Sequence, residues 1–243
     1  MKIFGCDIGC KNFAYCIIEI DDTIERPIKI LHWEVLNICS SDCLCCKTLR
    51  NKKQCATKAV YFDKETGCKY CSRHKPVDVK LTKLKADEKD NLYSYGVNMY
   101  DELDKRPFIL ECDSFVIENQ PNTLNQSMKS ISMILYSYFI QHRKEAHFIN
   151  AGMKVKLNED IAKKYITKDK KKYAITKKLG IGICKFILNY DVSNYLDFIE
   201  YFNNHKKQDD LCDAFLHAVV SYYKVNYYKD NKEMEKYIED FMK

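Results

Sequence analysis

A short apolar segment, Lys2-Ile3-Phe4-Gly5-Cys6-Asp7, runs directly into Ile8-Gly9-Cys10-Lys11-Asn12. The first piece has the composition of a buried strand, and Gly9 and Asn12 are typical of the turn that follows one. Asp7 stands at the end of this strand, where a buried carboxylate needs either a hydrogen-bonding partner or a metal ion. The segment therefore predicts an acid held at the edge of a sheet, although Asp7 as the cap of a turn is an alternative.

Further strands and helices follow from the pattern of apolar residues. Two more strands at 13–20 and 28–37, joined by short connections, predict an antiparallel meander with the first. Residues 114–118 and 147–151 predict a fourth and a fifth strand. Apolar spacings of three and four predict helices at 84–103, from Pro121 through Tyr138, at 173–188 and at 209–223, with a flexible Lys-rich connection up to Lys172. Strands followed by interleaved helices indicate an α/β domain.

Length and composition limit the kinds of protein this chain is expected to be. A chain of 243 residues with 46% hydrophobic side chains can bury one substantial core and carry one small appendage. No segment has the pattern of a signal peptide or a membrane span, so we expect neither secretion nor membrane insertion. Several of the 13 cysteines lie in apolar segments, as reduced thiols do, which favours an intracellular, reducing compartment.

The positive charge is concentrated in two regions. The formal net charge is +6, yet residues 39–80 hold ten Lys or Arg against four acids, and residues 143–178 hold twelve against four. Basic regions of this kind favour a polyanionic partner such as a nucleic acid. A single Lys-rich run is as often an ordinary solvated surface.

Three further acids accompany Asp7. Glu118 ends the apolar strand Phe115-Val116-Ile117. Asp210 and Asp213 are three residues apart on one face of the last predicted helix, near its start. Taken singly, Glu118 could pair with a lysine, and Asp209 or Asp210 could be an N-cap. Taken together, the acids predict a site that holds two divalent ions roughly 4 Å apart, the arrangement used to hydrolyse phosphodiesters.

Three motifs resemble, in their order along the chain, the catalytic motifs of RuvC-like Holliday junction resolvases of poxviruses, other large DNA viruses and mitochondria. They are Asp7-Ile8-Gly9-Cys10-Lys11-Asn12-Phe13-Ala14, Ile117-Glu118-Asn119-Gln120 and Lys206-Lys207-Gln208-Asp209-Asp210-Leu211-Cys212-Asp213-Ala214. The resemblance implies an RNase H-like mixed five-stranded sheet flanked by helices. It also implies a homodimer that makes paired, metal-dependent nicks in four-way DNA junctions during DNA recombination and repair.

The resemblance also implies roles for individual residues. Asp7, Glu118, Asp210 and Asp213 would bind two Mg²⁺ or Mn²⁺ ions, and Asp209 would stay outside the site. A lysine near the fifth strand completes such sites, and Lys154 is our candidate, with Lys170, Lys171 and Lys172 as alternatives. If the chain is viral, the replication site in the infected cell is the expected location.

Residues 39–80 predict an inserted Cys-rich module within a nuclease core formed by 1–38 and 81–243. The spacing of its cysteines and histidine is typical of structural zinc, whose binding would stabilise a segment with few apolar residues. The expected ligands are Cys46, Cys55, Cys71 and His74, with Cys43 or Cys68 as alternates, and spacing alone does not tell which of the neighbouring Cys43, Cys45 and Cys46 enters the site. Lys47, Arg50, Lys52, Lys53 and Lys58 would then form a surface for phosphate contact.

Two other functions remain open from the sequence. An RNase H-like scaffold with a zinc module could bind nucleic acid without cutting it, and another nuclease of the same fold could lack selectivity for junctions. The Asp7-Ile8-Gly9 opening also resembles the phosphate-binding start of sugar kinases and actin-like ATPases. That fold needs a second glycine-rich loop, and seven glycines in the whole chain argue against it.

Overall fold

The structure is a computed structural model that describes residues 1–39, 44–84, 92–120, 126–166 and 172–243. The chain forms two compact units. The first comprises Met1–Asn37 and Tyr100–Lys243, and the second comprises Ile38–Met99. The segment expected as an insert, 39–80, falls within the second unit.

A mixed five-stranded sheet forms the centre of the first unit, in the order β3-β2-β1-β7-β8. Its strands are β1 (Lys2–Asp7), β2 (Phe13–Ile20), β3 (Ile28–Leu36), β7 (Ser114–Asn119) and β8 (Ala146–Asn150). The first three are antiparallel neighbours, whereas β7 and β8 run parallel to β1. This order and these directions are those of an RNase H-like fold, as expected from the motifs.

The register between β1 and β7 determines where the first two acids lie. Gly5 pairs with Val116 and Cys6 with Ile117. Side chains alternate between the two faces of a sheet, so paired residues on neighbouring strands share a face. Continuing this register by one residue places Asp7 beside Glu118, on the same face and at the same end of the sheet.

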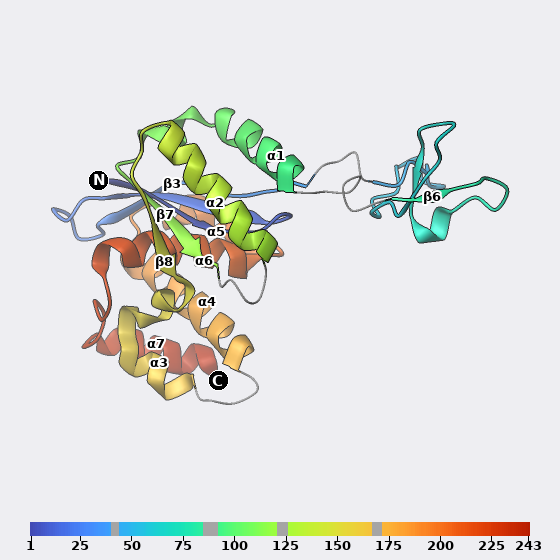
Figure 1. Cartoon of the computed structure of the whole chain (residues 1–243). Coiled ribbons are helices and arrows are strands. Elements are labelled where there is room, and N and C mark those ends of the chain that lie inside the picture. The colour runs from blue at the N-terminus through green and yellow to red at the C-terminus, as the bar shows by residue number, and fades with distance from the viewer. Residues whose placement is uncertain (40–43, 85–91, 121–125, 167–171) are drawn as a thin grey trace. The chain divides into compact units, whose positions relative to one another are not determined.

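Helix α2 (Gln126–Gln141) covers one face of the sheet (Figure 1). It packs through Phe139, whose ring lies 5.5 Å from that of Phe4 and 4.3 Å from that of Phe115. The remaining elements of the first unit include the C-terminal part of α1 (Leu92–Asp104), the 3₁₀ helices η4 (Pro107–Glu111) and η5 (Ala151–Asn158), and the helices α3 (Glu159–Tyr165), α4 (Lys172–Tyr190), α5 (Tyr195–Asn204), α6 (Gln208–Tyr223) and α7 (Lys232–Met242).

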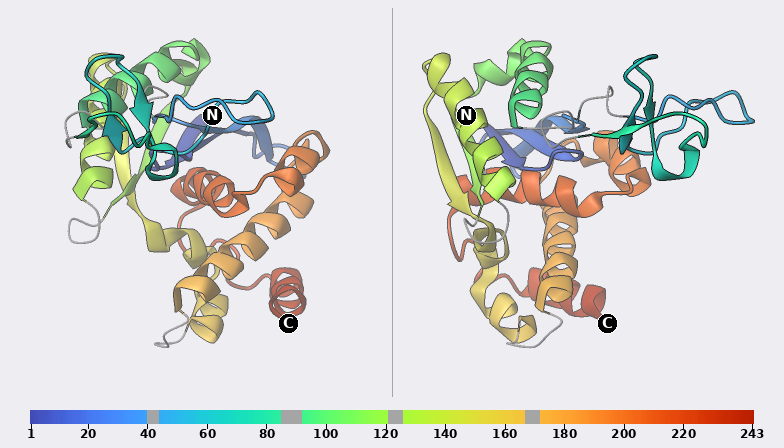
Figure 2. Two further views of the ribbon diagram at one scale, coloured as in Figure 1. Left: turned by 90° about the vertical axis from the view of Figure 1, so that its right-hand side faces the viewer. Right: turned by 45° about the vertical axis from the view of Figure 1, so that its right-hand side comes forward.

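Helix α6 covers the opposite face and approaches β1 very closely at Gly5. A Cβ atom built on Gly5 would lie 2.6 Å from both the Ala214 oxygen and the Ala218 nitrogen, so a larger residue cannot fit there. Helix α4 in turn lies between α6 and α7 (Figures 1 and 2). The core of this side is therefore built from β1, β2, α6 and α4.

The structure corrects one expectation about the Lys-rich region. Residues 151–165, expected as part of a flexible connection, form η5 and α3, and buried Val155, Leu157 and Ile161 anchor them to the core. Three apolar anchors are too few to give a clear helical period, and the lysines between them suggested a loop. No helix in the described ranges is both long enough and apolar enough to span a membrane.

The second unit contains a small three-stranded sheet in the order β5-β4-β6. Its strands are β4 (Tyr61–Phe62), β5 (Lys69–Tyr70) and β6 (Thr82–Lys83), and the 3₁₀ helix η2 (Ser72–His74) follows β5. Three buried cysteines, Cys45, Cys55 and Cys71, pack together in its interior. A unit with such short strands needs a further source of stability.

Candidate active site

Four acids from three elements line one pocket in the first unit. Asp7 comes from the end of β1, Glu118 from the end of β7, and Asp210 and Asp213 from the first two turns of α6. The pocket has a volume of about 410 Å³, and Lys154 from η5 also lines it. All the acids and the lysine that the motifs suggested therefore lie around the same cavity.

The close approach of α6 to β1 brings the acids of the two elements together. Because Ala214 and Ala218 lie against Gly5, the residue before Ala214 comes close to the end of β1, where Asp7 lies. The first turn of α6 also contains Asp209 and Asp210, and carboxylates are favoured at the positive end of the helix dipole. Gly180 of α4 lies close to Asp213, since a Cβ atom built on Gly180 would lie 3.9 Å from Oδ1 of Asp213.

Lys154 is buried, and its Nζ donates a hydrogen bond to Oδ2 of Asp213 within the pocket. Burial alone would lower the pKa of Lys154, but the pairing with Asp213 outweighs it, so the pKa lies above its usual value. Lys154 therefore supplies a fixed positive charge beside the acids. Among the alternative lysines, Lys170 and Lys171 lie outside the described residues, and the side chain of Lys172 is not described either.

Asp209 has a different role from its neighbours. Burial opposes its ionisation, but a hydrogen bond from Lys177 outweighs this effect and lowers the pKa of Asp209. Asp209 is thereby satisfied by a lysine on α4. Among the described residues, Asp210 forms one long ion pair, with Lys207, whose Nζ lies 3.7 Å from its Oδ2. This distance leaves the carboxylate able to bind another partner.

The three aspartates of the pocket resist ionisation in the metal-free protein. Burial, a hydrogen bond with Glu118 and the charges of Glu118 and Asp213 raise the pKa of Asp7 well above its usual value. Burial and the charge of Asp209 raise the pKa of Asp210. Burial also raises the pKa of Asp213, against the opposing effect of Lys154. The positive charge of Lys154 therefore does not neutralise this concentration of acids.

This set of donors fits a hard divalent cation. Carboxylate oxygens are the ligands that Mg²⁺ and Mn²⁺ prefer, and a bound cation would stabilise the ionised carboxylates that burial and mutual repulsion disfavour. The acids come from rigid strand ends and a helix, so they are held in place before any ion arrives. Asp7, Glu118, Asp210 and Asp213 are the residues that would hold such ions.

His217 also lies next to this site, and the sequence did not single it out. It is fully buried on α6, and its Nδ1 lies 3.1 Å from the carbonyl oxygen of Cys6. Burial lowers the pKa of His217, and the charges of Glu118, Lys154 and Asp213 act on it. Its position four residues after Asp213, on the same helix face, was the available signal.

A second cluster, in the other unit, joins Cys45, Cys55, Cys71 and His74. One ligand atom from each lies within 4.8 Å of the others. Nδ1 of His74 is 3.6 Å from Sγ of Cys45 and 3.4 Å from Sγ of Cys71. A tetrahedral zinc ion with ordinary bond lengths separates its sulfur and nitrogen ligands by about 3.6 Å. The cluster therefore fits zinc, and a zinc ion would supply the stability that the short strands lack.

Cys45 takes the place in this cluster that the sequence assigned to Cys46. Adjacent residues of an extended chain point to opposite sides. Cys45 is fully buried, whereas Cys46 is partly exposed and shares a hydrogen bond with Cys68, one of the two expected alternates. The other alternate, Cys43, lies outside the described residues.

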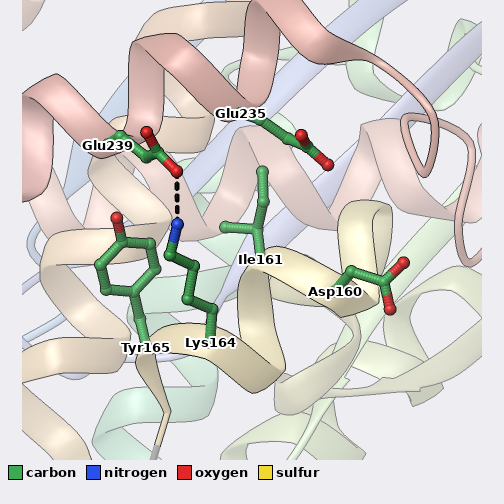
Figure 3. A pocket seen from close by; sticks show the side chains of 6 residues that line it. All are labelled: Asp160, Ile161, Lys164, Tyr165, Glu235 and Glu239. Atoms are coloured by element: carbon green, nitrogen blue, oxygen red, sulfur yellow. Dashed lines mark hydrogen bonds and ion pairs between the residues drawn. The ribbon is translucent and has the colours of Figure 1, made fainter.

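A smaller pocket between α3 and α7 has a volume of about 140 Å³ and lies away from these acids (Figure 3). Lys164 and Glu239 form an ion pair across it, while the Asp160 carboxylate points away from this pair. The pair joins α3 to α7 and so has a structural explanation. The pocket of the four acids is the stronger functional candidate.

Comparison with known proteins agrees with the expected family. Residues 3–122 match a family model described as mitochondrial resolvase Ydc2 / RNA splicing MRS1. That segment includes Asp7 and Glu118 but ends before Lys154 and α6. An uncharacterized protein of Acanthamoeba polyphaga mimivirus is 26% identical over an alignment of 307 residues, which covers 89% of this chain and 73% of the relative.

Two solved structures of the fowlpox virus Holliday junction resolvase are also similar. The first is 15% identical, with a TM-score of 0.49, and the match covers 92% of this chain and 98% of the other. The second, a complex of that resolvase with its substrate Holliday junction DNA, is 16% identical, with a TM-score of 0.47 and full coverage of both chains. The strand order and directions of the central sheet define the fold of the present chain.

Proposed function

We propose that this chain, whose residues 3–122 match a resolvase family model, is a Holliday junction resolvase, a Mg²⁺- or Mn²⁺-dependent endonuclease that resolves four-way DNA junctions. The observation that carries the proposal is the convergence of Asp7, Glu118, Asp210 and Asp213 on one pocket beside Lys154. Four acids around one buried lysine make a costly arrangement for a protein that only binds DNA. Two divalent cations would offset that cost.

The proposed chemistry is hydrolysis of a phosphodiester to give a 5′-phosphate and a 3′-hydroxyl. Asp7, Glu118, Asp210 and Asp213 would hold two ions, which would lower the pKa of an attacking water and stabilise the leaving oxygen. The strand ends keep the carboxylates of Asp7 and Glu118 in place. Nζ of Lys154, which lines the same pocket, would donate a hydrogen bond to a non-bridging oxygen of the scissile phosphate and stabilise the charge that develops there.

Junction resolution requires two such pockets. A four-way junction is resolved by cuts in two opposing strands, and this chain provides one carboxylate pocket. A homodimer with a twofold axis would present two pockets to the two strands. We therefore propose a homodimer, whose mass can be measured by light scattering after size-exclusion chromatography.

The second unit would have a structural and DNA-binding role. Zinc held by Cys45, Cys55, Cys71 and His74 would stabilise it. A turn at 49–53 is closed by hydrogen bonds between Leu49 and Lys53 and between Lys52 and Leu49, and it exposes Arg50, Lys52 and Lys53. We propose that this turn contacts the phosphates of a junction arm.

We propose a reducing cellular compartment as the site of action, and, if the source is a virus, the replication site of the infected cell. The described cysteines form no disulfides, and this includes Cys45, Cys55 and Cys71 of the candidate zinc site. Thiolate ligands persist only where they are protected from oxidation.

One test separates cutting from binding. A labelled four-way junction and a duplex of matched sequence are incubated with the protein in Mg²⁺ or in EDTA, and the cuts are mapped at nucleotide resolution. We expect symmetric Mg²⁺-dependent cuts in opposing strands of the junction alone. Asp7→Asn should abolish them, whereas Asp160→Asn, at an exposed position on α3, should not.

A nucleic-acid-binding protein without cleavage is the second candidate. The description of the matching family pairs a resolvase with an RNA splicing protein, which supports this alternative. It predicts tight binding of a junction or a structured RNA with no cuts in Mg²⁺ or Mn²⁺. Cleavage of duplex and junction at equal rates would instead indicate a nuclease of this fold without junction selectivity.

A further inference from the structure

We propose that His217 is a positioning residue of the carboxylate pocket. One ring nitrogen would fix the backbone beside Asp7, and the other would accept a hydrogen bond from a water that hydrates the cation held by the acids. This inference rests on the proposed metal-dependent function. It concerns a residue outside the three motifs that suggested the site.

The first half of the inference follows from the contact with Cys6. A carbonyl oxygen only accepts hydrogen bonds, so Nδ1 of His217, at 3.1 Å, must carry the proton that it donates to the Cys6 oxygen. The peptide unit of this carbonyl leads directly into Asp7. His217 therefore joins α6 to β1 at the point where β1 presents its acid, and it restrains the position of the Asp7 carboxylate relative to Asp213.

The second half follows from the other nitrogen. With the proton on Nδ1, Nε2 of the neutral ring is an acceptor, and it is buried with no hydrogen-bond partner among the described residues. Leaving a buried polar atom without a partner is unfavourable, so such atoms need an explanation. A side chain needed only for packing here would be apolar, as its neighbours Leu216 and Ala218 are.

The charges around the ring indicate which group donates a hydrogen bond to Nε2. His217 lies one helical turn after Asp213 on α6, and it contacts the carbonyl of Cys6, the residue before Asp7, so the ring lies close to the acids. The charges of Glu118, Lys154 and Asp213 act on it there. Mg²⁺ releases its waters reluctantly and keeps several of them in protein sites. Those waters need acceptors, and groups that orient the surroundings of a metal contribute strongly to its affinity. Nε2 is a neutral acceptor and adds no further negative charge to the pocket.

Two substitutions separate the two nitrogens. In His217→Asn the amide nitrogen can take the place of Nδ1, so the bond to the Cys6 oxygen is kept and the acceptor is lost. In His217→Gln the longer amide can reach the place of Nε2, and the Cys6 bond is lost. Titration calorimetry with Mn²⁺ alone measures affinity without reference to cleavage. We expect about 10–100-fold weaker binding for His217→Asn, and weaker binding also for His217→Gln.

Nitrogen-15 spectra of the imidazole provide a readout in the unaltered protein, which remains valid even if both variants fail to fold. We expect the metal-free ring to be protonated on Nδ1, and the Nε2 resonance to move when Mg²⁺ is added. Protonation on Nε2, a static Nε2 resonance, or wild-type Mn²⁺ affinity in His217→Asn would overturn the inference. If these results overturned the role of His217 but Asp7→Asn abolished Mn²⁺ binding, the proposed metal-dependent function would stand. If the wild-type protein failed to bind Mn²⁺, both the role of His217 and the proposed function would be wrong.

Discussion

Nζ of Lys154 and the carboxylate of Asp213 form a buried ion pair within the pocket, joining η5 to α6. The pair places the buried ammonium group of the site beside an acid that is also a candidate metal ligand. A cation that binds Asp213 would compete with Lys154 for the same carboxylate. Lys154 would then be free to donate to a phosphate oxygen of the DNA.

Lys154→Met keeps most of the side-chain volume and removes the charge. We expect cleavage at saturating Mg²⁺ to fall by about 10²–10³-fold, the usual effect of losing a donor to the transition state. Junction affinity measured in Ca²⁺ should change little, because one lysine contributes little to the total phosphate contact. Single-turnover cleavage and gel-shift assays measure the two quantities. Lys156→Met, at an exposed position on the same 3₁₀ helix, is the control, and equal rates in both variants would exclude this role for Lys154.

The acids should make the metal-free protein less stable as the pH rises. The pKa values of Asp7, Asp210 and Asp213 are raised in the folded state. The unfolded state therefore loses these protons first, and the contribution of the site to stability declines from about pH 4 up through the raised pKa values. Raising one pKa by a single pH unit corresponds to about 1.4 kcal/mol. In EDTA at pH 7.5 we expect Asp7→Asn to be more stable than the wild type by about 1 kcal/mol or more.

Denaturant unfolding in EDTA at pH 5 and at pH 7.5 measures this difference. The gain from Asp7→Asn should shrink at the lower pH, because the raised pKa lets more of the wild-type carboxyl be protonated there. Mg²⁺ at pH 7.5 should reverse the order of stability, since the wild type alone retains all four acids. A wild type more stable than Asp7→Asn in EDTA at both pH values would contradict the expected repulsion.

The cysteines of the second unit should differ in their effect on metal content. We expect one zinc ion per chain by elemental analysis, lost in Cys45→Ser and retained in Cys46→Ser. Cys45 lies in the cluster with His74, while Cys46 shares a hydrogen bond with Cys68. Loss of the ion in Cys46→Ser with retention in Cys45→Ser would restore the ligand set expected from spacing alone.

The exposed turn of the second unit should contribute to DNA affinity through charge. We expect a triple variant with Arg50→Gln, Lys52→Gln and Lys53→Gln to bind the junction more weakly. The slope of log Kd against log salt concentration should fall by about 0.9 for each phosphate that the variant no longer neutralises. Fluorescence anisotropy at several salt concentrations measures the slope. The control carries the same change of charge at exposed Lys229, Lys232 and Lys236. Equal slopes in the two triple variants would argue against DNA contact by the turn.

Gly5→Ala should damage both stability and metal binding. The added Cβ would meet the backbone of α6 at 2.6 Å, and neither β1 nor α6 can move without displacing an acid. Overpacking of this kind costs about 1–3 kcal/mol. Thermal unfolding should show the loss, whereas Gly152→Ala, where a Cβ meets nothing within 4 Å, should unfold like the wild type. Wild-type stability of Gly5→Ala would show that the two backbones can move apart at little cost.

The sequence predicted the strands that end at turn residues and the longer helices, and it missed two shorter helices. The β1 and β2 bounds were predicted correctly, because apolar strands end at clear turn residues. Helices α5 and α7 were missed although both carry apolar residues at helical spacing, such as Met234, Ile238 and Phe241 in α7; at 10 and 11 residues they are shorter than the predicted helices. The four acids were found from their motifs, and the structure places them together, but which metal they bind stays a prediction. His217 was missed because a single histidine four residues after an acid is a weak signal. Cys45 was missed because spacing does not tell which of two adjacent cysteines points inward.

The order of the acids along the chain has a consequence for biosynthesis. Asp7 leaves the ribosome before the second unit is made, while Asp213 follows only after the second unit and most of the first have been made. The pocket closes when α6 packs against Gly5 of β1, so a nascent chain lacks a complete set of acids until that late stage. A nuclease assembled in this way would remain inert throughout its own translation, and incomplete chains released early would be harmless to the nucleic acids around them.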